Sequence, residues 1–171
     1  MSRCKNEDSH RKPSCDSFLR VFCHSSRSCS SSTRPTDEGN NPVHSHDLHR
    51  LQQEAELGNV DAISTLGQLY HSGGGNGSGF SFEVPQDLPR AAWHYRRALE
   101  LSDFRDPISL NNLATFYLDG SGGVEKNDSE AARLFQLAAD QCPVARYNLA
   151  HMFWEGQGVP QDQERALKYF T

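Results

Sequence analysis

Apolar and small residues recur at fixed offsets from about residue 59 to the end of the sequence and predict a repeated helix. Each copy is centred on a leucine, with a small residue four positions before it, another one position after it, and an aromatic residue four positions after it. These offsets place the side chains on one face of an α-helix. The leucines are Leu66, Leu113 and Leu149, and the aromatic residues are Tyr70, Tyr117 and Phe153. We call the helix predicted around each leucine helix A.

A second pattern follows each helix A and predicts a partner, which we call helix B. It begins at a valine (Val84, Val124 or Val159), and three residues later comes Asp87, Asn127 or Asp162. Side chains of this type accept hydrogen bonds from the free N–H groups of a starting helix. An alanine seven residues after the valine and an aromatic residue eleven after it continue the pattern, and these aromatic residues are Tyr95, Phe135 and Phe170.

The ends of helix A are also marked. The N-cap positions hold Asn59, Asp106 and Cys142, and glycines stand seven residues after the leucines, at Gly73, Gly120 and Gly156. Glycine takes the left-handed conformation that closes many helices. Each unit is therefore helix A, a glycine turn and helix B. Helices of about 10–14 residues are marginal in isolation, so we expect the units to stabilise one another by stacking.

The repeats divide the chain into a tail over residues 1–46 and an array over 47–171. The array consists of a leftover helix at 47–57, repeat 1 at 59–101, repeat 2 at 106–140 and repeat 3 at 142–171. Repeat 3 stops partway through helix B and leaves Leu167 and Phe170 with little to cover them. We expect that the chain is a fragment of a longer repeat protein; the alternative is that a partner, including a second copy stacked end to end, covers this end.

The two patterns together resemble Sel-1-like repeats, which are relatives of the tetratricopeptide repeat. The phrases that carry the resemblance are "A…LG..Y..GGG…VPQD..RAA..Y..A" and "A..NLA..F..GQGVPQD.ERAL.Y", within residues 59–171. Repeat 1 departs from the family pattern by a longer glycine tract. The resemblance implies an all-α solenoid of about three helical hairpins. It also implies a role as an adaptor or scaffold that binds other proteins in degradation, signalling or organelle assembly.

The resemblance points to a candidate binding surface on helix A. In tetratricopeptide arrays, helix A lines a concave groove whose amides hold an extended peptide. The positions one residue before and two residues after each leucine share a face. They hold Thr65, Gln68, Asn112, Thr115, Asn148 and His151. These six residues, which we call the helix A ladder, are predicted to bind a protein or peptide; the alternative is an ordinary solvated face.

Trp93 is a further candidate partner-binding residue. When the three repeats are aligned on their valines, Trp93 occupies the same position as Arg133 and Lys168. Because these residues are polar, we place Trp93 on the outer side of helix B. Exposed tryptophan is enriched at interfaces. The alternative is that Trp93 covers the long first loop, and the sequence leaves the two open.

Composition separates the tail from the array and narrows the function. The tail is rich in Ser, Arg, Cys and His, and it contains too few apolar residues to offset its ordering entropy, so we expect disorder. A net charge of -5 gives no broad basic surface for nucleic acid. No apolar run reaches the length of a membrane span.

Signatures of catalysis are missing from the sequence. There is no nucleophile motif such as G-x-S-x-G, and "GGGNGSG" lacks the Lys-Ser or Lys-Thr of a phosphate-binding loop. The histidines and cysteines of the tail lack the paired short spacings of zinc sites. We therefore predict no enzyme activity, no cofactor and no metal site; the alternative is catalysis or metal handling by the tail.

The predicted function is that of a protein-binding adaptor or scaffold. The alternative is a regulatory repeat segment of a larger protein whose activity lies elsewhere. An odd number of cysteines without a pairing pattern favours a reducing compartment, and we predict a cytoplasmic location. The alternative is mitochondrial, because residues 17–35 are rich in Arg and Ser and contain no acid.

Overall fold

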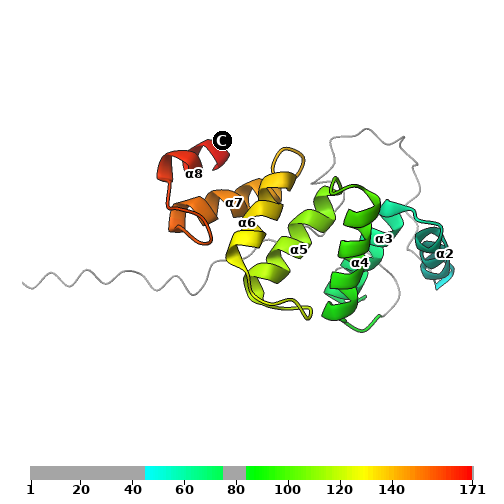
Figure 1. Cartoon of the computed structure of the whole chain (residues 1–171). Helices are drawn as coiled ribbons and strands as arrows, with labels where there is room; N and C mark the ends of the chain where they lie inside the picture. The colour runs from blue at the N-terminus through cyan, green and yellow to red at the C-terminus, as the bar shows by residue number, and fades with distance from the viewer. Residues whose placement is uncertain (1–44, 75–83, 171) are drawn as a thin grey trace, which may run out of the picture.

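The computed structural model describes residues 45–74 and 84–170, and for residues 45–47 it describes the backbone alone (Figure 1). The predicted disordered tail lies outside the described residues except for Ser45 and His46, which belong to a helix. Most of the predicted glycine insert of repeat 1 also lies outside them.

The described part of the chain is built from helices and contains no strand, as the all-α prediction requires. The helices are α2 (Ser45–Glu56), α3 (Val60–Ser72), α4 (Leu88–Leu101), α5 (Pro107–Asp119), α6 (Asp128–Ala138), α7 (Pro143–Glu155) and α8 (Gln163–Phe170). Three hairpins, α3–α4, α5–α6 and α7–α8, follow one another along the array (Figure 1). α2 packs on α3, α4 packs on α5, and α6 packs on α7, so contacts pass from each hairpin to the next.

Side chains begin the helices as the sequence predicts. Asp87 Oδ1 accepts a hydrogen bond from the backbone N–H of Arg90 at 2.9 Å, and Asn127 Oδ1 accepts one from Glu130 at 3.0 Å. Asp106 caps α5 in the same way at 3.0 Å. Cys142 stands at the N-cap of α7 but makes no side-chain capping bond. Asp162 Oδ1 accepts the equivalent bond from Arg165 N–H at 2.9 Å, so the predicted caps of helix B are confirmed in all three repeats.

Two of the three predicted glycine closures are confirmed. Gly120 and Gly156 adopt the left-handed conformation, and the N–H of each bonds back to a carbonyl of the preceding turn. Gly73 differs, because its φ of 70° is combined with a ψ of 124°. The chain there leads into the longer first loop, and Gly74 N–H donates to Val84 O at 2.7 Å, which holds the two ends of that loop together.

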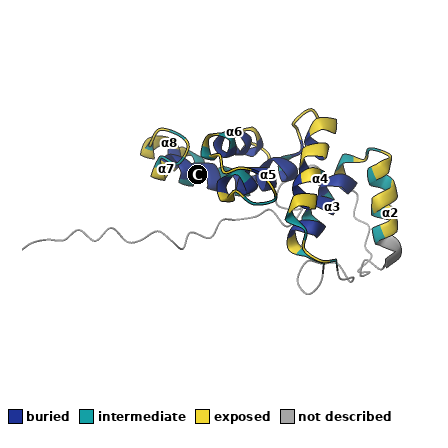
Figure 2. Ribbon diagram, turned by 60° about the horizontal axis from the view of Figure 1, so that its bottom comes forward, coloured by how far each residue is buried: buried dark blue, intermediate teal, exposed yellow. Residues whose placement is uncertain are grey.

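The core is a single column of side chains that runs between the two helices of each hairpin. Tyr95 of the first hairpin, Phe135 of the second and Leu149 of the third are fully buried. Figure 2 shows this burial concentrated on the inner faces, with α5 the most enclosed helix. α3 and α4 approach so closely that a Cβ at Gly67 would lie 2.6 Å from Tyr95 Cε1. At the other end Leu167 and Phe170 of α8 are 57% and 44% exposed.

Candidate partner-binding surfaces

The helix A ladder lies on α3, α5 and α7, but the structure buries its members to different extents. Thr65, Gln68 and His151 are half-buried, whereas Asn112, Thr115 and Asn148 are buried. Asn112 and Thr115 are buried because α5 packs against α3, α4 and α6, and Asn148 of α7 reaches the same interior by bonding to Asn111. The ladder is thus partly a surface and partly an interior row. Its role in binding stays a prediction.

The two threonines of the ladder bond to their own helices. Thr65 Oγ1 donates to the carbonyl of Asp61 at 2.6 Å, and Thr115 Oγ1 donates to the carbonyl of Asn112 at 2.7 Å. A hydroxyl committed to its own helix in this way has its donor satisfied.

The asparagines of the ladder belong to a buried polar network that spans the array. Asn148 Nδ2 donates to Asn111 Oδ1 at 3.3 Å, and Asn111 Nδ2 donates to Asn112 Oδ1 at 3.1 Å. Asn112 Nδ2 in turn donates to the Tyr95 hydroxyl at 3.1 Å, and that hydroxyl lies 3.3 Å from His71 Nδ1. Amides and rings from α7, α5, α4 and α3 are therefore joined in one chain of hydrogen bonds.

Asn111, Tyr95 and His71 were missed by reasoning from the sequence. One signal was present: Tyr95 is the one aromatic residue of the Tyr95, Phe135 and Phe170 column that carries a hydroxyl. A buried tyrosine hydroxyl usually finds a hydrogen-bond partner, so this hydroxyl was a signal, not used above, for a polar group in the core of repeat 1. No pattern identified Asn111 or His71.

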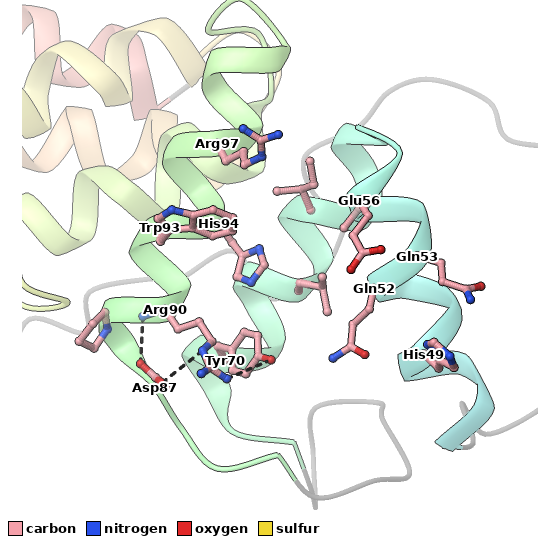
Figure 3. A pocket seen from close by; sticks show the side chains of 14 residues that line it. His49, Gln52, Gln53, Glu56, Tyr70, Asp87, Arg90, Trp93, His94 and Arg97 are labelled. Atoms are coloured by element: carbon pink, nitrogen blue, oxygen red, sulfur yellow. Dashed lines mark hydrogen bonds and ion pairs between the residues drawn. The ribbon is translucent and has the colours of Figure 1, made fainter.

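A second surface is a cleft between α2 and α4, floored by α3, with a volume of about 1070 Å³ (Figure 3). We call it the α2–α4 cleft. The α2 wall carries His49, Gln52, Gln53 and Glu56, the floor includes Ile63, Leu66 and Tyr70, and the α4 wall carries Asp87, Arg90, Trp93, His94 and Arg97. Trp93, which the sequence singled out, is 57% exposed at this cleft.

Rings stack along the α4 side of the cleft. The His94 ring stacks on Tyr70 at a centroid distance of 5.4 Å and meets the Trp93 indole edge-on at 4.9 Å. The Arg90 guanidinium lies 4.9 Å from the Tyr70 ring centre, and Arg90 Nη1 donates to the Tyr70 hydroxyl at 3.4 Å. A cationic group held over a tyrosine face is attracted to the ring electrons, so Arg90 fixes the Tyr70 ring in place.

The charge state of His94 is set by its surroundings. Burial, with a smaller contribution from the positive charge of Arg90, lowers the pKa of His94 from 6.5 to about 4. The imidazole is therefore neutral at pH 7. Its Nδ1 atom is buried and has no hydrogen-bond partner.

Two other kinds of site are absent from the described residues. No group of three or more His, Cys, Asp or Glu side chains there is placed to hold a metal ion. In residues 45–74 and 84–170 we found no helix with both the length and the apolar character needed to cross a membrane.

A protein-family model described as Sel1 repeat matches residues 61–103, 107–141 and 143–171. Among curated proteins, the chain is 28% identical to the ERAD-associated E3 ubiquitin-protein ligase component HRD3B of Arabidopsis thaliana, over 70% of this chain and 17% of that protein. It is also 28% identical to the chitin synthase regulator SKT5 of Saccharomyces cerevisiae, over 69% of this chain and 16% of that protein. The chain thus spans about a sixth of the length of these relatives.

Solved structures show the same architecture. A protective antigen of uropathogenic Escherichia coli, c5321, which displays an SLR fold, superposes with a TM-score of 0.60 and 31% identity, over 72% of this chain and 24% of that one. A Sel1 repeat protein from Oxalobacter formigenes also has a TM-score of 0.60, at 23% identity, over 77% of this chain and 92% of that one, and it supports the fold alone.

Proposed function

The chain belongs to the Sel1 repeat family, and we propose that it binds a partner protein as an adaptor or scaffold without catalysis of its own. Repeats of this family generally mediate protein–protein interaction. The observation that carries the proposal is the family match to all three hairpins, which form a contiguous array of stacked units.

The helix A surface is the site we propose for this partner. Gln68 and His151 are half-buried side chains that flank the enclosed α5, and each has donor and acceptor capacity for a peptide backbone. The Asn148–Asn111–Asn112–Tyr95 network continues to His71 of α3, so it joins α7, which carries His151, to α3, which carries Gln68. A site supported by a hydrogen-bonded layer of this kind is held in one geometry, which favours binding by lowering its ordering cost.

The test combines capture of partners with a matched surface control. The tagged chain is used to capture proteins from cells of the source organism, and each captured protein is purified and re-tested for binding. Gln68→Ala combined with His151→Ala should weaken the affinity about tenfold or more, whereas Gln136→Ala, an exposed change on α6, should leave it unchanged. Equal affinities for all three proteins would refute the helix A site.

The second candidate is a regulatory repeat segment of a larger protein. It is favoured by the relatives, because the chain matches about a sixth of a ubiquitin-ligase component and of a chitin synthase regulator. An antibody raised against residues 105–171 should then detect, in cells, a protein much longer than 171 residues. Detection of the 171-residue chain alone would exclude this alternative.

A further inference from the structure

The α2–α4 cleft lies on a different face of α3 from the helix A ladder. Ile63, Leu66 and Tyr70 face the cleft, while Thr65 and Gln68 belong to the ladder. At about 100° per residue the two sets point in nearly opposite directions around the helix. A ligand in the cleft would therefore not compete directly with one on the ladder.

The α2 wall of the cleft is polar at positions where a later helix B is apolar. Gln52 lies seven residues before the N-cap of the following helix A, and Phe135 of α6 occupies the same position in its unit. By the same count His49 corresponds to Ala132, and Glu56 corresponds to Ala139. Ala132 and Phe135 of α6 and Ala139 at its C-cap are buried, whereas the three α2 residues are exposed.

This replacement decides what kind of occupant the cleft can hold. Another helix packed as in the rest of the array would bury apolar side chains against α2, but it would leave Gln52 and Glu56 desolvated without partners, which is unfavourable. An extended peptide instead presents unpaired backbone N–H and C=O groups, and the exposed amides of Gln52 and Gln53 can bond to both. A polar wall thus favours an extended segment over a helix.

The α4 wall adds positive charge and an aromatic surface. Arg90 and Arg97 are seven residues apart, or about two turns, so they project from the same side of α4. Arg90 lies 3.6 Å from Asp87, but within the described part of the chain no ion pair involves Arg97. Between them lie the Trp93 and His94 rings. Glu56 stands on the opposite wall (Figure 3).

A matching change appears on α4 itself. His94 lies ten residues after Val84, and Leu134 lies ten after Val124. Leu134 is 1% exposed, so in repeat 2 an apolar side chain is buried at this position. In repeat 1 a polar ring with an unpartnered buried nitrogen stands there instead. Both walls therefore depart from the repeat pattern at the same cleft.

We propose that the α2–α4 cleft binds an extended peptide segment of a partner protein that carries a carboxylate next to an aromatic or branched apolar side chain. Arg97 binds the carboxylate, and the Trp93 and His94 rings receive the apolar side chain. Gln52 and Gln53 hold the peptide backbone. The site is additional to the helix A surface, and its failure would leave the proposed function in place.

The experiment selects peptides against the whole chain. A phage-displayed library of random linear 12-residue peptides is selected on the immobilised 171-residue protein, and the most enriched peptide is synthesised with a fluorescein label for anisotropy titration. We expect enriched peptides to contain Asp or Glu beside Leu, Ile, Phe or Tyr. Replacing that acid by its amide should weaken binding about tenfold.

Variants on α4 locate the site. Arg97→Ala and Trp93→Ala should each weaken binding of the labelled peptide about tenfold, because these exposed residues form the anion and apolar contacts. The matched control is Arg96→Ala, because Arg96 is an exposed arginine on the same helix that does not line the cleft. This change should alter the affinity for the labelled peptide less than about twofold. Circular dichroism verifies that all variants are folded.

Three results would overturn the proposal. The first is a selection that enriches no peptide. The second is an equal loss of peptide affinity in Arg96→Ala and Arg97→Ala. That result would show that the peptide is attracted to positive charge on α4 without a defined site. The third is loss on Gln68→Ala but not on Arg97→Ala, which would place the peptide on the helix A surface and support the proposed function instead.

Discussion

His94 shows how one residue can depart from the column it occupies. The equivalent positions hold Leu134 and Tyr169, which are buried and half-buried. A column with an imidazole, a leucine and a tyrosine has no consistent polarity, so it gave no signal in the sequence. Trp93 was noticed because its column is otherwise cationic. The site residue beside it became visible only when α2, α3 and α4 were placed around it.

The depressed pKa of His94 predicts a specific pH dependence of folding. The folded-state pKa of about 4 lies below the ordinary value of 6.5, so protonation favours the unfolded chain. The stability that the folded protein gains by keeping His94 neutral is fully present above pH 6.5 and is lost as the pH falls toward 4. Because solvent reaches part of the ring, we expect wild type to lose about 1–2 kcal/mol more stability than His94→Leu between pH 7 and 4.5.

Urea unfolding followed by circular dichroism at the two pH values measures this difference. The carboxylates titrate in both proteins, so the comparison isolates His94. Equal losses of unfolding free energy would show that the imidazole is not desolvated in the folded protein.

Asp106 provides a second test of how a buried charge affects stability. Its capping hydrogen bond favours the ionised carboxylate, whereas its burial disfavours it. Burial raises the pKa of its carboxyl, while the hydrogen bond from the backbone N–H of Ser109 partly offsets this. Folding stability therefore falls as the pH rises through the raised pKa. Asn caps as well as Asp and carries no charge, so Asp106→Asn should unfold at equal or higher urea concentration at pH 7.

Asp106→Ala is the contrasting change. It removes the acceptor for Ser109 N–H and should lower the free energy of unfolding by about 1 kcal/mol. Thermal or urea denaturation at pH 7 ranks the stabilities of wild type, Asp106→Asn and Asp106→Ala. If Asn destabilised as much as Ala, the carboxylate charge itself would be required at this helix start.

The helix A ladder marks the limit of prediction at the residue scale. Offsets along a helix show that Asn112 and Gln68 share a direction, but they do not show which neighbouring helices cover that direction. The structure encloses Asn112 within the array and leaves Gln68 half-buried. Burial depends on contacts between units, and such contacts have no signature in a single repeat.

At the scale of elements, the turn glycines have two roles. They allow the turn conformation, and their lack of a side chain lets the turn pack closely on the neighbouring hairpin. Gly122 lies against the Leu88 carbonyl at the start of α4, where an added Cβ would be at 3.0 Å. Gly158 lies against the backbone of Asp128 at the start of α6. Leu88 and Asp128 both stand four residues after the valine of their unit. Each of these turns therefore packs on the equivalent point of the preceding helix B.

This contact predicts unequal effects of two similar substitutions. Gly158 and Gly123 have φ values of 69° and 72°, so Ala is strained to a similar degree at both. A Cβ at Gly123 meets nothing within 4 Å, whereas one at Gly158 collides with Asp128. We expect Gly123→Ala to cost about 1 kcal/mol and Gly158→Ala about 2–4 kcal/mol, since backbone must move.

Differential scanning calorimetry or urea titration of the two variants compares these costs. The backbone strain of alanine is similar in both variants. The difference between their unfolding free energies therefore reports the packing of the α7–α8 turn on α6. Similar costs would mean that the hairpins are not held together at this point.

The elements themselves were predictable because their signals are local. Caps at Asp87 and Asn127, closures at Gly120 and Gly156, and the spacing of leucines and aromatics each involve residues within a few turns. The α2–α4 cleft was not predictable, because it needs α2 to be placed beside α4, about 40 residues further along the chain. The departure at Gly73 follows from the length of the loop after it.

At the scale of the whole molecule, the array has no centre on which all helices converge. Apart from α3 with α5, the principal contacts join helices that are consecutive in the chain. Stability in such an array is approximately the sum of unit and junction contributions. The buried Asn148–Asn111–Asn112–Tyr95 network adds polar contacts between units, so separating the hairpins would leave several amides unpaired.

A hairpin removed from the array should therefore fail to fold. In residues 60–101 alone, Tyr95 would lose its bond from Asn112 and its contact with Phe116, whose ring centre lies 6.0 Å from its own. Two helices of 13 and 14 residues are marginal without neighbours. Circular dichroism should show mainly unfolded peptide, while residues 45–171 should be helical and unfold cooperatively in urea. Native helicity in the isolated hairpin would mean that each unit is stable alone, and the junctions would then serve to orient the units for binding rather than to hold them folded.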